Sequence, residues 1–150
     1  MSRYSARPIT IADTGALYAL IDASDAWHEA VVTWWGEDAT RRRDIRVPVT
    51  VLPEVCHLLA ARVGKDAELA FVDAVAAGEF TVEPLDEDDL ERIVEIMRQY
   101  GDFPLGFVDA SLVALAERLD ARDLLTTDRR HFSVVRPQHT RQFTLLPQAR

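Results

Sequence analysis

The chain has 150 residues, of which 48% are hydrophobic and 28% are charged. This balance excludes a disordered chain, and no apolar run is long enough to span a bilayer. The formal net charge of −8, from 17 basic and 25 acidic residues, argues against a protein that holds nucleic acid by bulk electrostatics alone. We predict one soluble domain over residues 1–150, and the absence of an export-signal pattern predicts a cytoplasmic location.

Strand-like and helix-like segments alternate along the chain, which indicates an α/β fold. In order, the sequence predicts a strand at 9–12, helices at 14–21 and 26–37, a strand at 46–49, helices at 51–63 and 65–77, a strand at 80–84, helices at 86–100 and 107–119, and strands at 124–127 and 143–146. Pro48 suits a sheet edge or a strand end. The stretch 133–142 shows no clear pattern.

The predicted helix at 86–100 opens with four acidic residues, where the helix macrodipole favours negative charge. Its apolar residues Leu90, Ile93, Met97 and Tyr100 recur at helical spacing. They predict the face that this helix buries.

Four acidic residues occupy similar places in this pattern. Asp13 and Asp128 follow strands, whereas Glu54 and Asp109 lie in the first turns of helices. In an open α/β sheet the carboxyl ends of strands and the amino ends of helices meet at one edge, so the four acids can converge. Carboxylates gathered in this way suit Mg²⁺ or Mn²⁺. The same acids are equally well explained as helix caps and dipole partners, and the spacing alone leaves both explanations open.

Asp109 is the most informative of the four. Its apolar neighbours predict a largely buried helix; they are Phe107, Val108, Leu112, Val113 and Leu115. A carboxylate on such a helix is costly unless a cation pairs with it.

Four local strings carry more information than the spacing. They are IADTGAL at 11–17, LPEV at 52–55, LGFVDASLVALAERL at 105–119 and LLTTDRRHF at 124–132. Together, in this order and over nearly the full chain, they resemble the motifs of PIN-domain ribonucleases. The resemblance is closest to the VapC-type toxins of bacterial type II toxin–antitoxin systems.

The resemblance implies a three-layer α/β/α domain with a central parallel sheet of about five strands. It also implies a Mg²⁺- or Mn²⁺-dependent endoribonuclease that acts as a toxin, forms a homodimer and is inhibited by a small cognate antitoxin. Asp13 and Asp109 match the principal metal-binding aspartates of the family, and Glu54 and Asp128 match its other acidic positions. The resemblance therefore implies an intact catalytic quartet.

Three further polar residues are candidate supporting residues. Thr14 can cap the helix that follows it or hold a metal-bound water, and the cap is the preferred interpretation. Thr126 can contact the carboxylates or the substrate, although Thr is also a good strand former. Asp102 precedes Asp109 but is separated from it by Pro104, so it is a candidate supporting acid or a loop cap.

The basic and aromatic residues have less specific interpretations. Arg129 and Arg130 adjoin Asp128 and can neutralise the acids or bind RNA phosphate. The basic run at 41–43, together with Arg46, is interpreted as a solvated loop in preference to an RNA contact. Trp34 and Trp35 are assigned to the core or a dimer surface.

Two histidines and one cysteine adjoin these segments. His57 and His131 are interpreted as packing or surface histidines in preference to a role in proton transfer. Cys56 is the only cysteine, which excludes an internal disulfide and a cysteine-based zinc site. We predict that it is a buried structural thiol.

Other functions fit the sequence less well. An aspartyl phosphatase needs a second Asp two residues after the first, where this chain has Gly15. A receiver domain needs a lysine late in the chain, but the only lysine is Lys65, and no Gly-rich phosphate loop is present. The alternative that remains is a catalytically silent PIN-like protein that acts through its binding partners.

Overall fold

The computed structural model describes residues 7–148 and contains a five-stranded sheet. The strands are β1 (Ile9–Ala12), β2 (Asp44–Pro48), β3 (Thr81–Glu83), β4 (Asp123–Leu125) and β5 (Thr144–Leu146). All neighbouring strands are parallel, in the order β3-β2-β1-β4-β5. The prediction of a parallel sheet of about five strands is confirmed.

The strand order places β1 at the centre of the sheet. From β1 the chain adds β2 and β3 on one side, then crosses back to add β4 and β5 on the other. The direction of winding therefore reverses between β1 and β4, where Ile11 pairs with Leu124 and Ala12 with Leu125. In open α/β sheets this switch point opens a crevice at the carboxyl ends of the strands.

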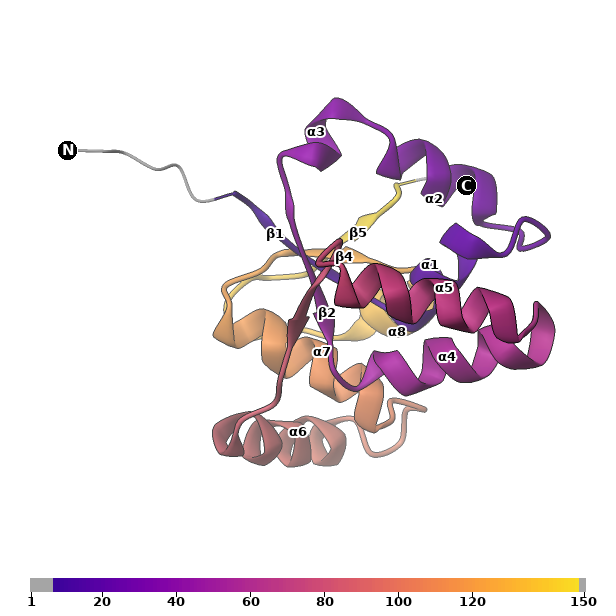
Figure 1. The fold of residues 1–150 in the computed structure, drawn as a ribbon. Coiled ribbons are helices and arrows are strands. Elements are labelled where there is room, and N and C mark those ends of the chain that lie inside the picture. Colours follow the sequence, from indigo (N-terminus) through magenta and orange to yellow (C-terminus); the bar gives the residue numbers. More distant parts are fainter. Residues whose placement is uncertain (1–6, 149–150) are drawn as a thin grey trace.

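Helices cover both faces of the sheet (Figure 1). They are α1 (Thr14–Ile21), α2 (His28–Trp35), α3 (Asp38–Arg41), α4 (Val51–Arg62), α5 (Lys65–Ala76), α6 (Glu87–Gln99), α7 (Phe107–Arg118) and α8 (Arg129–Val134). Helix α1 packs against α2 and α4, and α4 packs against α5, whereas α6 and α7 pack against each other. The arrangement is the predicted three-layer α/β/α architecture.

Several predicted boundaries were wrong. Strand β2 begins at Asp44 because this residue pairs with Ile9, and β4 ends at Leu125 because the chain then turns into a helix cap. The sequence did not predict α3 or α8. Both helices are too short to display a helical period, so only their local caps could have indicated them.

The buried face of α6 also differs from the prediction. Ile93 is buried as expected, but Leu90 and Met97 are exposed, and Asp89 and Ile96 are buried instead. Both oxygens of Asp89 accept hydrogen bonds from Arg118 Nε on α7 at 3.1 Å. Because this charged pair must stay together at the α6–α7 contact, it selects which side of α6 faces inward.

The basic run at 41–46 is divided between solvent and the sheet. Arg41 and Arg42 are exposed, in keeping with a solvated loop. Arg43 donates to Asp123 at 2.5 Å, and Arg46 pairs with Asp44 and Glu83. These two arginines therefore neutralise acids within the fold.

The tryptophans of α2 pack inside the protein. Trp34 is buried, and the Trp35 ring lies 5.5 Å from the Phe80 ring. Of the two predicted roles, core or dimer surface, the structure shows the contribution to the core. Cys56 is only half-buried, although burial still raises the pKa of its thiol.

Within residues 7–148, no helix combines the length and apolarity needed to cross a membrane.

Two leucines that differ in burial predict different losses of stability when each is replaced by alanine. Leu124 on β4 is fully buried, whereas Leu69 on α5 is 67% exposed. Leu124→Ala should lower the free energy of unfolding by about 2–5 kcal/mol, because it removes buried methyl groups and leaves a cavity. Leu69→Ala should change it by less than about 0.5 kcal/mol. Urea unfolding measures both, and equal effects would contradict this description of the core.

Candidate metal-dependent active site

The candidate site lies at the carboxyl edge of the sheet, beside the switch point. The backbone N–H of Asp13 donates to Leu125 O at 2.8 Å, so the end of β1 is joined to the end of β4. Asp128 follows β4 and caps α8, whereas Glu54 and Asp109 lie in the first turns of α4 and α7. The sheet topology therefore brings four distant carboxylates to one edge.

Thr126 connects Asp13 to Asp128. Its hydroxyl donates to Asp13 Oδ2 at 3.0 Å and accepts from the backbone N–H of Asp128 at 2.9 Å. Thr126 is fully buried, so both bonds are shielded from water. The contact with a carboxylate that the sequence offered as one interpretation of Thr126 is present.

Thr14 connects Asp13 to Glu54, but not as the predicted cap. The N-cap of α1 is Asp13, whose Oδ1 accepts from the backbone N–H of Thr14 at 2.7 Å. This leaves the Thr14 hydroxyl free to donate to Glu54 Oε2 at 2.8 Å. The expectation that Thr14 caps the helix is wrong, because Thr14 is already the first residue of α1 and Asp13 occupies the N-cap position.

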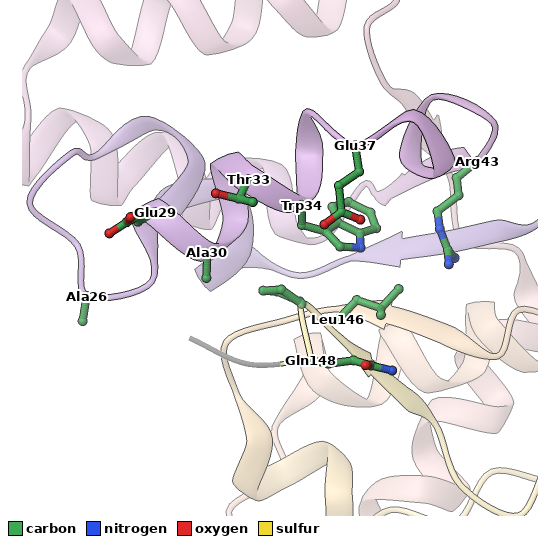
Figure 2. Close-up of a pocket in the computed structure, with 10 residues that line it drawn as sticks. Ala26, Glu29, Ala30, Thr33, Trp34, Glu37, Arg43, Leu146 and Gln148 are labelled. Atoms are coloured by element: carbon green, nitrogen blue, oxygen red, sulfur yellow. The ribbon is translucent and has the colours of Figure 1, made fainter.

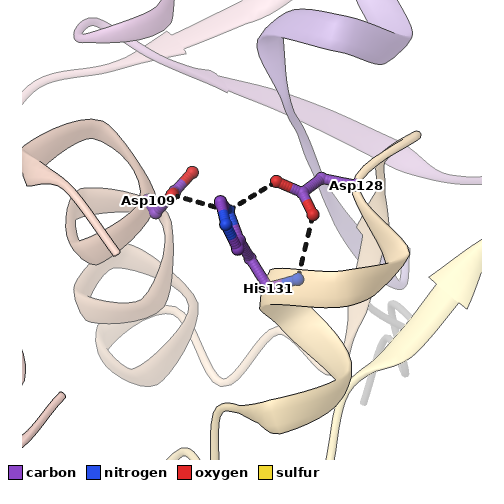
Figure 3. A group of neighbouring side chains, drawn as sticks. All are labelled: Asp109, Asp128 and His131. Atoms are coloured by element: carbon purple, nitrogen blue, oxygen red, sulfur yellow. Dashed lines mark hydrogen bonds and ion pairs between the residues drawn. The ribbon is translucent and has the colours of Figure 1, made fainter. Parts of the chain in front are cut away.

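His131 lies between Asp109 and Asp128 (Figure 3). Its Nδ1 atom is 3.2 Å from Asp109 Oδ2 and 2.6 Å from Asp128 Oδ2. The sequence predicted a packing or surface histidine; the ring does pack against Phe103, but it also contacts two acids of the site, which the sequence did not predict. The available signal was the spacing from Asp128, because an N-cap aspartate brings the residue three positions later onto its own side of the helix.

The four carboxylates differ in their exposure to solvent. Asp13 is only 7% exposed, the side chains of Asp109 and Asp128 are 20% and 32% exposed, and Glu54 is exposed. The site therefore runs from a buried floor at Asp13 to an open rim at Glu54. An open rim gives a large polymeric substrate access to the acids.

Burial makes the ionised form of Asp13 unfavourable. The pKa of Asp13 is raised from 3.8 to about 7, mainly by loss of water and also by the charges of Asp109 and Asp128, although hydrogen bonds from Thr14 and Thr126 oppose this rise. The pKa of Asp109 is also raised, first by burial and then by Asp128 and Glu54, while His131 lowers it. A strongly perturbed carboxylate beside other acids is typical of functional sites.

These residues fit a divalent cation. Asp109, Asp128 and His131 each offer one ligand atom, and these atoms lie within 4.8 Å of one another. Buried carboxylates with raised pKa values gain most from a neighbouring positive charge. The carboxylate oxygens of this group are suitable ligands for Mg²⁺ and Mn²⁺.

Asp102 does not join this group. It is exposed in the loop between α6 and α7, and within residues 7–148 it forms no hydrogen bond or ion pair with the quartet. His57 is exposed on α4, in keeping with its interpretation as a surface histidine.

The two arginines after Asp128 have different surroundings. Arg129 donates from Nη1 to Leu145 O at 3.0 Å, and its guanidinium carbon lies 4.9 Å from the centre of the Trp27 ring. Its Nε and Nη2 atoms are shielded from solvent. Arg130 is exposed. Arg129 therefore anchors α8 to the edge strand β5, and Arg130 is the arginine available to a ligand.

A separate cavity of about 720 Å³ lies between α2 and the segment after β5 (Figure 2). Its lining includes Glu29, Trp34, Arg43 and Leu146 and none of the four acids of the candidate site. The carboxylate site is therefore distinct from this cavity.

The fold and the carboxylates at its switch point are those of an α/β nuclease-like domain, and comparison with known families gives the class. Residues 10–136 match the PIN domain family, so the chain belongs to that family.

The chain is also similar to a named ribonuclease. It is 38% identical, over 137 residues, to ribonuclease VapC26 of Mycobacterium tuberculosis, a match that covers 91% of this chain and 99% of that protein.

Solved structures share the fold. VapC20 of Mycobacterium tuberculosis, a toxin that cleaves the sarcin–ricin loop, has a TM-score of 0.72 at 24% identity, covering 79% of this chain and 89% of that one. VapBC2 of Rickettsia felis, solved on a fragment of promoter DNA, has a TM-score of 0.65 at 14% identity, with 91% and 96% covered. FitAcB of Neisseria gonorrhoeae has a TM-score of 0.56 at 16% identity, with 79% and 87% covered.

The raised pKa of Asp13 predicts how stability depends on pH without metal. The folded chain binds this proton more tightly than the unfolded chain does, so the stability is fully present below the unfolded value near 3.8 and is lost as pH rises through about 7. Between these limits the wild-type free energy of unfolding should fall by about 2–4 kcal/mol in the presence of a chelator.

Asp13→Asn removes this titration and should flatten that part of the profile. At about pH 8 in chelator, the variant should be more stable than the wild type by roughly 1–3 kcal/mol, because it no longer buries a charge. Urea titrations at several pH values measure the effect. Parallel profiles for the two proteins would show that Asp13 is not the group responsible.

Proposed function

We propose that this protein is a metal-dependent endoribonuclease that acts as the toxin of a toxin–antitoxin pair. The observation that carries the proposal is the group of four carboxylates, Asp13, Glu54, Asp109 and Asp128, at the switch point of the sheet. Membership of the PIN family and the 38% identity to a ribonuclease support RNA as the substrate class.

The residues assigned to the metal are the two that the resemblance implies, Asp13 and Asp109, with Asp128 beside them. Two of the three acids have a raised pKa, so a cation at this position would relieve their mutual repulsion. A bound Mg²⁺ or Mn²⁺ supplies an activated water and stabilises charge on a phosphodiester.

The hydrogen bonds of the site indicate different roles for Asp13 and Glu54. Thr126 and the Thr14 backbone hold both oxygens of Asp13, which fixes the orientation of this carboxyl group. Thr14 holds only one oxygen of Glu54, and the Glu54 side chain is exposed. We assign to Glu54 the acceptance of the proton from the attacking water, because it is the least buried of the four acids.

RNA phosphate must approach an acidic site on a protein whose net charge is −8. Arg130 is exposed and adjoins Asp128, so we assign it a contact with the substrate backbone. Arg129 positions α8, since its guanidinium is held by Leu145 and Trp27.

A small antitoxin protein is the proposed partner, and a homodimer is the proposed assembly. Structural relatives have been solved as VapBC2 and FitAcB, which supports a partner for this chain as well. The intact carboxylates favour an enzyme over a silent PIN-like binding protein.

The geometry at Gly15 argues against an aspartyl phosphatase. A Cβ atom at Gly15 would lie 2.4 Å from Thr127 Oγ1, so the position where that class needs its second Asp is closely packed against Thr127.

Removal of one carboxylate tests the enzyme. Asp109→Asn keeps the shape of the side chain but removes its charge, so metal-dependent RNA cleavage should fall by at least about 10²-fold. Asp73→Asn, an exposed change on α5, should leave the rate unchanged. Purified proteins are compared on total RNA with Mg²⁺, with Mn²⁺ and with chelator. Cleavage by the Asp109 variant at the same sites and rate would show that the site is wrongly assigned.

Growth measurements test the toxin. Induction of the wild-type chain without a partner should arrest growth, whereas Asp109→Asn at equal protein level should not, because arrest requires RNA cleavage. Mapping of RNA ends shortly after induction identifies the target. Equal arrest by both proteins would favour the silent binding protein over the catalytic toxin.

A further inference from the structure

His131 is the only histidine within 4.0 Å of a carboxylate oxygen in the described part of the chain. Its Nδ1 atom faces two carboxylates from different elements, Asp109 on α7 and Asp128 before α8. Figure 3 shows the imidazole between these two acids, with the same nitrogen directed at both. A single Nδ1–H cannot form a well-aligned hydrogen bond to both of them at once.

The ring is fixed from two sides. Asp128 Oδ1 accepts from the backbone N–H of His131 at 2.9 Å, so the carboxylate that faces the ring also caps its helix. Phe103 packs edge-on against the imidazole, with ring centres 5.3 Å apart. The ring therefore does not need to reorganise in order to present Nδ1 to the site.

The contacts of Nδ1 are not those of an ordinary hydrogen bond. The atom is shielded from solvent, and among residues 7–148 its contacts with the two carboxylates have the distances of ion pairs but not the geometry of hydrogen bonds. These contacts thus lack the alignment that a donated N–H requires. A cation placed between the imidazole and the carboxylates would give this nitrogen a partner as a metal ligand.

The spacing suits ligands of one ion. Metal–ligand distances of about 2.1 Å in an octahedral site place adjacent ligand atoms about 3.0 Å apart. The distance from Nδ1 to Asp109 Oδ2 is 3.2 Å, and that to Asp128 Oδ2 is 2.6 Å. A small opening on the Asp128 side would admit the ion.

We propose that His131 is a nitrogen ligand of the metal ion, together with Asp109 and Asp128, and that it shifts the preference of the site from Mg²⁺ toward a first-row transition ion. The proposal rests on the metal dependence proposed above. Mg²⁺ prefers oxygen ligands, whereas transition ions accept imidazole nitrogen more readily.

Pulsed electron paramagnetic resonance of bound Mn²⁺ tests the proposal directly, because a coordinated imidazole gives nitrogen modulation that carboxylates do not. The wild-type protein should show this modulation, and His131→Ala and His131→Gln should lose it. The matched control is His57→Ala, which removes an exposed histidine one turn after Glu54 and should retain the modulation.

Calorimetric titration with Mn²⁺ and Mg²⁺ supplies a second readout. His131→Ala should weaken Mn²⁺ binding by about tenfold or more. It should change Mg²⁺ binding by less than about threefold, since oxygen ligands dominate there. The Gln variant keeps a polar side chain and serves as the reference if the Ala variant unfolds, which melting in chelator would reveal.

Wild-type Mn²⁺ binding without nitrogen modulation would overturn the proposal and leave the carboxylate metal site standing. Modulation that persists in both His131 variants would also overturn it. Tighter metal binding by His131→Ala would identify the imidazole as a built-in counter-ion that the metal displaces. A complete lack of Mn²⁺ and Mg²⁺ binding by the wild type would instead reject the metal dependence on which the proposed function rests.

Discussion

Burial of the Asp13 carboxyl group where β1 meets β4 is the constraint on which the site depends. The backbone of Asp13 is bonded to Leu125, so this carboxyl group lies where the sheet reverses its direction of winding. Two hydrogen bonds, from Thr14 and Thr126, only partly offset the loss of water, and the pKa rises to about 7. The fold therefore holds a group whose ionised form needs a positive charge beside it.

The arginines elsewhere in the fold provide little positive charge near Asp13. Arg43, Arg46, Arg92 and Arg118 each pair with acids of the sheet or of α6 and α7, and Arg129 is held by Leu145 and Trp27. His131 is the basic group that reaches the carboxylates, with Nδ1 directed at Asp109 and Asp128. A divalent cation would meet the same electrostatic need at higher charge, which is why the acids and the imidazole are best understood as one site.

The site combines a buried, fixed floor with a rim that is open to a long RNA substrate. Asp13 and Thr126 are buried at the sheet, and Phe103 holds the imidazole in place. Glu54 lies at the exposed rim, and the Thr14 hydroxyl links it to the floor. Such a division positions ligand atoms firmly without enclosing the substrate.

The sequence by itself determined the α/β class, the five strands and the longer helices, and the resemblance carried by its motifs gave the family and the parallel sheet. Alternation of short apolar runs with helical periods fixes a βαβ arrangement, and the strings around Asp13, Glu54, Asp109 and Asp128 fix the resemblance. The structure places these four acids at one edge, and their catalytic roles stay predictions. The sequence also predicted the acidic start of α6 correctly, because a cap is a local interaction.

Only the tertiary structure decided the features that depend on contacts between distant segments. The buried face of α6 follows Asp89 and its partner Arg118 on α7, which no helical period encodes. Thr14 bonds to Glu54 on another helix, and His131 reaches Asp109 across the site. In each case the partner lies far away in sequence, so the side chain's role was set by packing and charge rather than by its neighbours along the chain.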